Sequence, residues 1–367
     1  MAQATLTQLE NIISTYVDAS KQTQKGFTAS TDDLTGLLDK IAMTITMDTA
    51  FYDSLPELDG EKLEWGATIE EYFEDLTKPV DFDPTGANNN SPAYPTYRPV
   101  LYDYPLGLKT FKKSISYVKY KKACLNSSVY AQLVANNYKK LEDSIASYKM
   151  FAKLGLMGNF IIKVEAVFSG ASTLTANTAY SVGAYVKDAS HYGVVVKAIP
   201  NTNTETDVAD LPENIVILDN LAQVLAVPED TSTGEAFIKQ LKKDITIAKR
   251  PNEQSLSGGA IGAEQGLVLY LKEGVLPSIE VDTLAGAFNQ ERLAVPVEIK
   301  EVKDFGQAYS GKTYALLMDR RAIRLHNNED LSLNFVNADG AFINIVRHLD
   351  FTGFISGNCF VKIYQDD

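Results

Sequence analysis

The sequence predicts an α+β protein, and three features of its 367 residues point to that fold class. The last third, from Val295 to Asp367, is a run of short β-branched and aromatic segments with Gly, Asn or Asp at each break. A long amphipathic helix is predicted over residues 125–157, and a charged, proline-rich stretch precedes it. The strand-rich end carries no residue set suited to catalysis. The combination favours a protein that assembles with copies of itself.

Two short helices are predicted within residues 1–50. Apolar residues recur at helical spacing in each, and residues 21–28 form a polar break between them. Short helices gain most of their stability from packing, so each needs a surface to lie on.

Residues 55–123 are predicted to project as a long loop or hairpin. Acidic residues crowd the part from Glu57 to Asp83, six prolines fall between Pro79 and Pro105, and six tyrosines between Tyr94 and Tyr120. Lys109 to Lys122 has the pattern of one strand. Such a segment has little core of its own, so contact with another molecule is expected to stabilise it.

The long helix is expected to begin after a cap at Asn126 or Ser127 and to end at Gly155 and Gly158. Beyond it the pattern is β-rich as far as residue 230, and a second helix is predicted from Thr233 to Lys249. The strands predicted between the two helices and just after the second are Phe160–Val164, Tyr180–Val182, Val194–Val196, Ile215–Leu218 and Leu267–Leu271. In the last third the predicted strands are Val297–Ile299, Tyr314–Met318, Ile323–His326, Leu331–Phe335, Phe342–Phe354 and Phe360–Tyr364, which together are expected to build a sheet.

Composition limits the function classes. The net charge is −13 and the sequence pI is about 4.8, which argues against adhesion to nucleic acid or anionic lipid. Two cysteines are too few for a disulfide framework, so a reducing compartment is expected. The sequence has no signal-peptide pattern and no apolar run long enough for a membrane helix.

No catalytic, cofactor-binding or metal-ligating residues are predicted. The three histidines stand far apart without ligand partners. The glycine-rich stretch from Ser257 to Gly262 lacks the Gly-Lys-Ser ending of a phosphate loop and is interpreted as a mobile loop.

Charge segregation supplies the candidate contact residues. The acidic pairs between Glu70 and Asp75 are open to three interpretations: acid–base catalysis, a solvated face, and a surface for a partner, of which the last is favoured. The hypothesis is that this acidic segment, with two aromatic anchors, docks on basic residues of a neighbouring subunit; pairing within one subunit stays open as the alternative. The subunit-contact candidates are Glu70, Glu71, Tyr72, Phe73, Glu74, Asp75, Lys112, Lys121, Arg320, Arg321 and Arg324.

Three stretches resemble a known family. Thr68 to Lys78 is similar to the entry of an extended loop, Val281 to Asn289 to a helix of an axial domain, and Met318 to Phe354 to the return into a peripheral domain. With the order of parts, they resemble the major capsid proteins of tailed double-stranded-DNA phages, which have the Hong Kong 97-type fold, and most of all those of small podoviruses.

The resemblance implies a division of the chain. Residues 1–52 would be the N-arm, 53–123 the extended loop with a flanking peripheral-domain segment, and 124–165 the spine helix with a peripheral-domain strand. Residues 166–322 would form the axial domain, and 323–367 would complete the peripheral-domain sheet. Residues 166–230 match least well, and an insertion is expected there.

The resemblance also implies a function. The chain would be a structural protein that self-assembles through pentamers and hexamers into an icosahedral or prolate head shell around phage DNA. It would contact the packaged double-stranded DNA without sequence specificity, work with a separate scaffolding protein and a portal protein, and assemble in the host cytoplasm without membrane contact. Two alternatives stay open: a nanocompartment shell filled with enzyme, and a β-rich carbohydrate-acting enzyme or binding module.

Overall fold

The structure is a computed structural model, and it describes residues 51–63, 71, 82, 84–85, 101–116, 127–259, 262, 266–278, 297–337 and 342–366. The two predicted N-terminal helices and the predicted axial helix at 281–289 lie outside these residues. The chain divides into two units, which are described separately. Unit 1 contains Met1–Ser54, Gly107–Met150 and Asn328–Asp350, and unit 2 contains Leu55–Leu106, Phe151–Asn327 and Phe351–Asp367.

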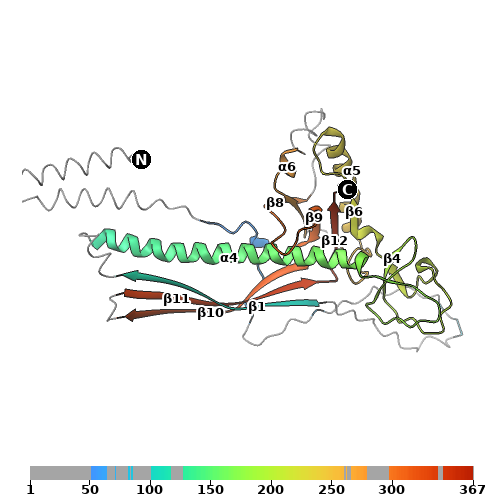
Figure 1. The fold of residues 1–367 in the computed structure, drawn as a ribbon, viewed down its shortest axis with the longest axis horizontal. Coiled ribbons are helices and arrows are strands. Elements are labelled where there is room, and N and C mark those ends of the chain that lie inside the picture. The colour runs from blue at the N-terminus through green and yellow to red at the C-terminus, as the bar shows by residue number, and fades with distance from the viewer. Residues whose placement is uncertain are drawn as a thin grey trace, which may run out of the picture. The chain divides into compact units, whose positions relative to one another are not determined.

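The long helix α4 runs from Ser127 to Ser169, which is 43 residues, or about 65 Å at 1.5 Å per residue (Figure 1). The predicted helix is confirmed, but its predicted end at Gly155 and Gly158 is wrong. A Cβ atom at Gly158 would overlap the backbone carbonyl oxygen of Phe305, so close packing rather than helix termination requires this glycine. The strand predicted at Phe160–Val164 is also wrong, because this run lies within α4, where Phe160, Ile161 and Val164 are buried.

A three-stranded sheet has the order β1-β11-β10, with β1 at Leu101–Ser116, β10 at Ile323–Asn337 and β11 at Phe342–Ser356. The strand predicted at Lys109–Lys122 is confirmed as far as Ser116 and begins earlier. As an edge strand, β1 tolerates Pro105. The two strands predicted at Ile323–His326 and Leu331–Phe335 form one continuous strand, β10.

Within unit 1 the sheet packs on the N-terminal half of α4. The rings of Phe111 and Tyr148 meet edge to face with centroids 5.7 Å apart. Arg347 on β11 pairs with Glu142 on α4 and, at 2.6 Å, with Asp330 on β10. These contacts join both strands of the β10–β11 hairpin to the helix.

A five-stranded sheet has the order β6-β12-β9-β7-β8. Its strands are β6 at Ala222–Val224, β12 at Val361–Gln365, β9 at Thr313–Asp319, β7 at Leu267–Lys272 and β8 at Glu298–Val302. The strands of the last third therefore do not build one sheet: β8, β9 and β12 belong here, and β10 and β11 to the three-stranded sheet. Every residue of β9 is buried, as expected for a central strand covered on both faces.

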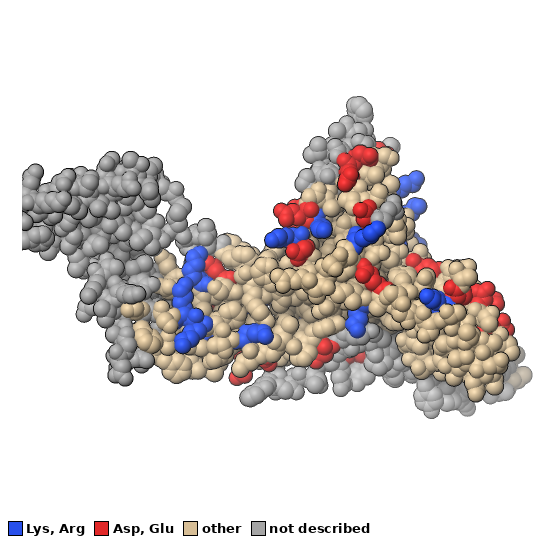
Figure 2. Space-filling model, in the orientation of Figure 1, with Lys and Arg blue, Asp and Glu red and all other residues tan. Residues whose placement is uncertain are grey.

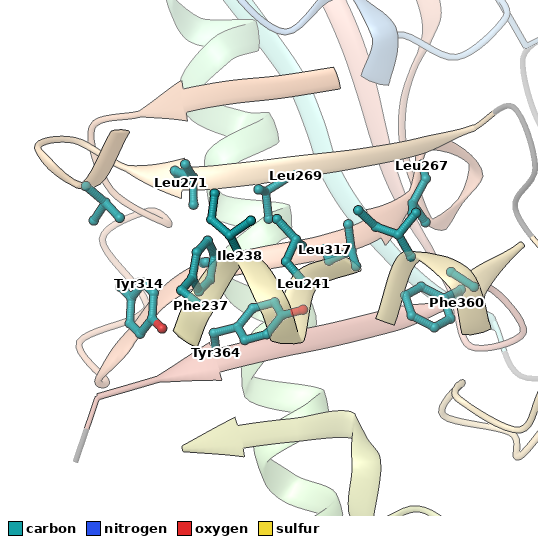
Figure 3. Close-up of a cluster of buried hydrophobic side chains, with 14 residues drawn as sticks. Phe237, Ile238, Leu241, Leu267, Leu269, Leu271, Tyr314, Leu317, Phe360 and Tyr364 are labelled. Carbon is teal, nitrogen blue, oxygen red and sulfur yellow. The ribbon is translucent and has the colours of Figure 1, made fainter. Parts of the chain in front are cut away.

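Helix α5, at Thr231–Ala248, covers one face of this sheet (Figure 3). Asp230 caps it: the Asp230 carboxylate accepts a hydrogen bond from the backbone N–H of Thr233 at 2.8 Å. Figure 3 shows Leu241 of α5 beside Leu269 and Leu317 of the sheet. The ring of Phe237 packs against those of Tyr314 and Tyr364, with centroids 5.7 Å and 5.2 Å away. The predicted helix at Thr233–Lys249 is confirmed.

A third sheet, of four strands, has the order β2-β3-β4-β5. Its strands are Ser172–Thr173, Tyr185–Lys187, Tyr192–Val195 and Ile215–Ile217, and they enclose a separate core that includes Val186, Val195 and Ile215. The strand predicted at Tyr180–Val182 is wrong, since only an isolated bridge joins Tyr180 to Ile199. Residues 171–218 thus form a small β-subdomain.

The glycine-rich stretch after α5 begins as a packed turn rather than a mobile loop. Ser255 is fully buried, and its hydroxyl accepts from the N–H of Gly259 at 2.9 Å. Gly258 has φ of +79°, and a Cβ atom there would crowd Val194 of β4.

The remaining described elements are short helices: η1 at Pro56–Leu58, η2 at Val208–Asp210, η3 at Asp219–Leu221, α6 at Val275–Ser278 and η5 at Arg320–Ala322.

Candidate subunit-contact site

Residues 55–63 of unit 2, which we call the root segment, are firmly held by the rest of that unit. Leu55 and Leu58 are buried, and the ammonium group of Lys153 donates to the carbonyl oxygen of Leu55 at 2.7 Å. The same ammonium lies 3.0 Å from a carboxylate oxygen of Asp59. One fully buried lysine of α4 therefore fixes both ends of the turn η1.

The start of β10 holds the root segment from a second side. The N–H of Gly60 donates to the carbonyl oxygen of Leu325 at 2.9 Å, and that of Leu63 to Asn327 at 3.2 Å. The His326 ring covers Gly60, where any Cβ atom would overlap it. The root segment thus runs as a partial extra strand along β10.

Arg324, a predicted intersubunit contact, binds this segment of its own chain. Its guanidinium donates to the carbonyl oxygen of Glu57 at 2.9 Å and to that of Asp59 at 3.3 Å. Arg324 therefore positions the root segment.

The Glu57 carboxylate organises a charged network at the edge of the five-stranded sheet. It accepts hydrogen bonds from Tyr270 and Lys300, each at 3.1 Å. Burial and the negative charge of Glu57 both raise the pKa of Tyr270. Burial lowers the pKa of Lys300, but the carboxylates of Glu57 and Glu298 outweigh it and raise that pKa.

Arg320 belongs to the same network, since its guanidinium pairs with Glu298. Figure 2 shows acidic and basic side chains interspersed in this part of the chain. The charge of Arg320 is thus balanced within its own subunit.

Arg321 is paired with Asp319, whose carboxylate accepts from the guanidinium at 2.6 Å. This hydrogen bond raises the pKa of Arg321. The positive charge of Arg321 acts to lower the pKa of Glu71. The Glu71 carboxylate also accepts a hydrogen bond from the Ser356 hydroxyl at 2.7 Å. Burial raises the pKa of Glu71 in spite of these two neighbours. Glu71 is the residue of the acidic segment that the structure describes, and it is bound within its own subunit.

Lys112 is exposed on β1 and can meet a second molecule. Glu70, Tyr72, Phe73, Glu74, Asp75 and Lys121 lie outside the described residues. The structure therefore brings Glu71 and Arg321 together, anchors Arg320 and Arg324 elsewhere in unit 2, and leaves Lys112 open.

Sequence reasoning missed the buried charges. Lys153 stands among apolar residues of α4, and this isolated position within an apolar run was the available signal. Asp244 of α5 and Lys362 of β12 form a buried ion pair 3.5 Å apart. The hydroxyl group of Tyr364 donates to the Asp244 carboxylate at 2.8 Å. Burial lowers the pKa of Lys362. No local pattern indicated this pair, because its members are far apart in sequence.

Among the described residues no three His, Cys, Asp or Glu side chains are placed to hold a metal ion. His191 pairs with Asp219 at 2.7 Å, and this hydrogen bond raises the pKa of His191. Of the helices that the structure describes, none has the length and apolar character of a membrane span.

Comparison with known proteins identifies the family. The model of the Phi29-like phage major capsid protein family matches residues 3–361. No curated protein matches the sequence. In the capsid structure of Staphylococcus phage Andhra, one chain is 10% identical with a TM-score of 0.56, and the match covers 88% of this chain and 86% of that one.

A second solved structure, of the head fiber and inner core protein gp22 of native bacteriophage P68, contains a chain with 12% identity and a TM-score of 0.53. That match covers 88% of this chain and 86% of the other. At these identities the likeness concerns the fold alone. The comparisons do not favour the nanocompartment or the carbohydrate-acting protein. The chain belongs to the Phi29-like phage major capsid protein family, and it is a structural protein of the phage capsid.

Proposed function

We propose that copies of this chain assemble as pentamers and hexamers into a closed icosahedral or prolate head shell around phage genomic DNA. The observation that carries the proposal is the family match over residues 3–361. A separate scaffolding protein would direct the assembly in the host cytoplasm, and a portal protein would occupy one vertex. The acidic net charge of −13 suits a wall that encloses DNA without gripping it.

Within this proposal the elements take the roles of a Hong Kong 97-type subunit. Helix α4 is the spine, and the three-stranded sheet belongs to the peripheral domain. The five-stranded sheet with α5 belongs to the axial domain, which takes β12 at Val361–Gln365 out of the peripheral-domain sheet expected at 323–367. The small β-subdomain at 171–218 is an insertion in the axial domain. The 43-residue length of α4 supports its role as the spine.

Assembly can be tested by expressing the chain with its scaffolding protein and measuring sedimentation. We expect megadalton particles that electron microscopy shows as closed shells. A chain that stays monomeric or dimeric under all conditions would contradict the proposal.

The subunit contact is proposed to join the acidic segment of one subunit to basic residues of the next. Since Arg320, Arg321 and Arg324 have partners in their own chain, the partners proposed now are Lys112 and Lys121. Tyr72 and Phe73 would supply apolar anchors inside the charged rim. Single exposed pairs are worth about 0–1 kcal/mol, but their repetition at every interface can set register and assembly rate.

Charge reversal tests this contact. Glu70→Lys combined with Glu74→Lys should block assembly while each subunit stays folded. The matched control is Glu205→Lys with Glu213→Lys, which makes the same change in net charge at exposed positions of the small β-subdomain. Normal assembly of the first double variant at ordinary salt, or failure of both, would contradict the contact.

A further inference from the structure

Helix α5 carries a row of basic side chains on the face opposite its core. Phe237 and Leu241 are buried against the five-stranded sheet (Figure 3). At 3.6 residues per turn, the positions that point the other way are 239, 243, 246 and 250. The C-cap residue next to the last of them is also a lysine. We use the name basic stripe for the exposed residues Lys239, Lys243, Lys249 and Arg250.

The cations of the basic stripe have no carboxylate partners among the described residues. No described acidic side chain lies within ion-pair distance of any member of the stripe. Elsewhere in the described chain Arg320, Arg321 and Arg347 each pair with a carboxylate. The whole chain has 47 acidic and 34 basic residues, so cations without partners on one helix face are unexpected. They indicate that the anion they meet belongs to another molecule.

The acidic side chains of α5 and the loop after it leave most of this positive charge uncompensated. Asp244 is buried, and Lys362, 3.5 Å away, balances its charge. Glu235 and Glu253 are exposed, and they lie beyond the two ends of the stripe in the sequence. Lys242, which is half-buried, adds a further positive charge beside the stripe.

The helix dipole explains only part of this arrangement. Cations stabilise the C-terminal turn of a helix, and the effect fades within that turn. Lys249 and Arg250 follow the last residue of α5, Ala248, but Lys239 and Lys243 both lie more than one turn before it. An anion long enough to run along the helix accounts for all four positions.

Duplex DNA fits the stripe better than an acidic peptide does. From Lys239 to Lys249 the stripe extends about 15 Å at 1.5 Å per residue, and DNA carries one negative charge per about 1.7 Å of its axis, so several phosphates can face the stripe at once. Phosphate contacts need only positive or hydrogen-bonding groups, whereas a peptide interface depends on buried apolar anchors. The remaining position of the row is Thr246, so the row offers no such anchor.

The net charge of −13 does not prevent such a contact at short range. Physiological salt screens exposed charges beyond about 8 Å, so phosphates next to α5 respond mainly to the stripe. The cap at Asp230 and the buried face fix the helix, so the cations are aligned before DNA arrives.

We propose that the basic stripe of α5 binds the phosphate backbone of the packaged duplex DNA without reading its sequence. The inference rests on the proposed shell, because the DNA must lie next to this face of the subunit. It gives an otherwise acidic subunit one defined contact with the genome.

DNA binding by unassembled full-length subunits tests the chemistry without a shell. The probe is a fluorescent duplex of mixed sequence, and the readout is anisotropy at about 20 mM salt, where screening is weak. Lys239→Gln combined with Lys243→Gln should weaken binding at least tenfold. The slope of the logarithm of affinity against the logarithm of salt concentration should become shallower by about two. Both positions are exposed, so circular dichroism should show an unchanged fold.

The matched control is Lys272→Gln with Lys303→Gln, which removes the same charge at exposed positions of unit 2. Its affinity should stay within about twofold of the wild type, because these lysines lie outside the stripe. Equal losses in the two double variants, or no binding by the wild type, would overturn the inference and leave the proposed shell untouched. Polyglutamate is the acidic-peptide probe. If it binds the wild type and the duplex does not, the partner is an acidic protein and the inference fails.

Filled particles test whether the stripe meets DNA in the shell. Formaldehyde should cross-link lysines of α5 to the genome, and mass spectrometry should find the adducts within residues 239–250. In particles that close and fill, adducts at other lysines with none in α5 would overturn the inference. Failure to form closed particles would instead contradict the proposed shell on which the inference rests.

Discussion

The ammonium group of Lys153 lies 2.7 Å from the carbonyl oxygen of Leu55, although the two residues are 98 positions apart. This hydrogen bond, with the Asp59 ion pair, joins α4 to the root segment. Lys153, which has no exposed surface, therefore anchors the root segment to α4.

Replacing Lys153 by Met should lower the free energy of unfolding by about 1–3 kcal/mol, because the Leu55 carbonyl loses its shortest hydrogen bond, keeping the donor Leu58 N–H at 3.3 Å, and Asp59 loses its ion-pair partner. Urea unfolding followed by circular dichroism measures the change. Lys239→Met, at an exposed position of α5, is the control and should stay within about 0.5 kcal/mol of the wild type. Equal effects of the two substitutions would show that the anchor contributes nothing.

The two glycines of α4 should respond in opposite directions to alanine. A Cβ atom at Gly158 would overlap Phe305, so Gly158→Ala should destabilise by about 1–3 kcal/mol. A Cβ atom at Gly155 meets nothing within 4 Å, and alanine is the better helix former, so Gly155→Ala should stabilise by about 0.5–1 kcal/mol. Melting temperatures measure both, and a shift of the same sign in both variants would contradict the close packing at Gly158.

Glu71 should make stability depend on pH. Burial raises its folded-state pKa above the unfolded value of 4.5, so the folded state holds the proton more tightly. Stability therefore falls as the pH rises from the unfolded pKa to the raised folded pKa, and it is constant beyond that.

Glu71→Gln should remove this contribution. Relative to the variant, the wild type should lose melting temperature as the pH rises through the window that begins near 4.5. The exposed carboxylate of Glu61 provides the control, Glu61→Gln. A constant difference between wild type and Glu71→Gln across this range would show that Glu71 is not buried as described.

Cys359 should resist thiol reagents in the native protein. It is 9% exposed, and burial raises the pKa of its thiol to about 12, so little thiolate is present at neutral pH. In a Cys124→Ser variant, which leaves Cys359 as the remaining thiol, labelling should be slow in buffer and complete within minutes in urea. Rapid labelling of the folded protein would contradict the burial. Cys124 lies outside the described residues.

Asp219→Asn should lower the pKa of His191, which the Asp219 hydrogen bond raises above 6.5. NMR titration of the imidazole C–H signals of the unassembled subunit measures the shift. The contribution of this pair to stability is full below the unfolded-state pKa and is lost as the pH rises through the raised folded pKa. His348, which contacts Thr110 rather than a carboxylate, serves as the reference signal and should be unaffected.

The sequence by itself determined the parts of this protein that depend on local periodicity. The amphipathic pattern placed α4 and α5, and β-branched runs placed β7, β9, β11 and β12 within a few residues of their observed bounds. These signals are reliable because each side chain's environment repeats with the period of its own helix or strand. The order of these elements also supported the resemblance to phage capsid proteins, which the family match confirms.

The tertiary structure decided what depends on residues far apart in sequence. Gly158 looks like a helix end in the sequence, and only the approach of the Phe305 loop shows why a glycine stands inside α4. The division of the last strands between two sheets follows from which partners β10 and β12 meet, and strand alternation does not encode a partner. The arginines illustrate the same limit. Their charge was visible in the sequence, but a salt bridge forms with whichever carboxylate the fold brings within about 4 Å, and for Arg320 and Arg321 that carboxylate belongs to their own chain.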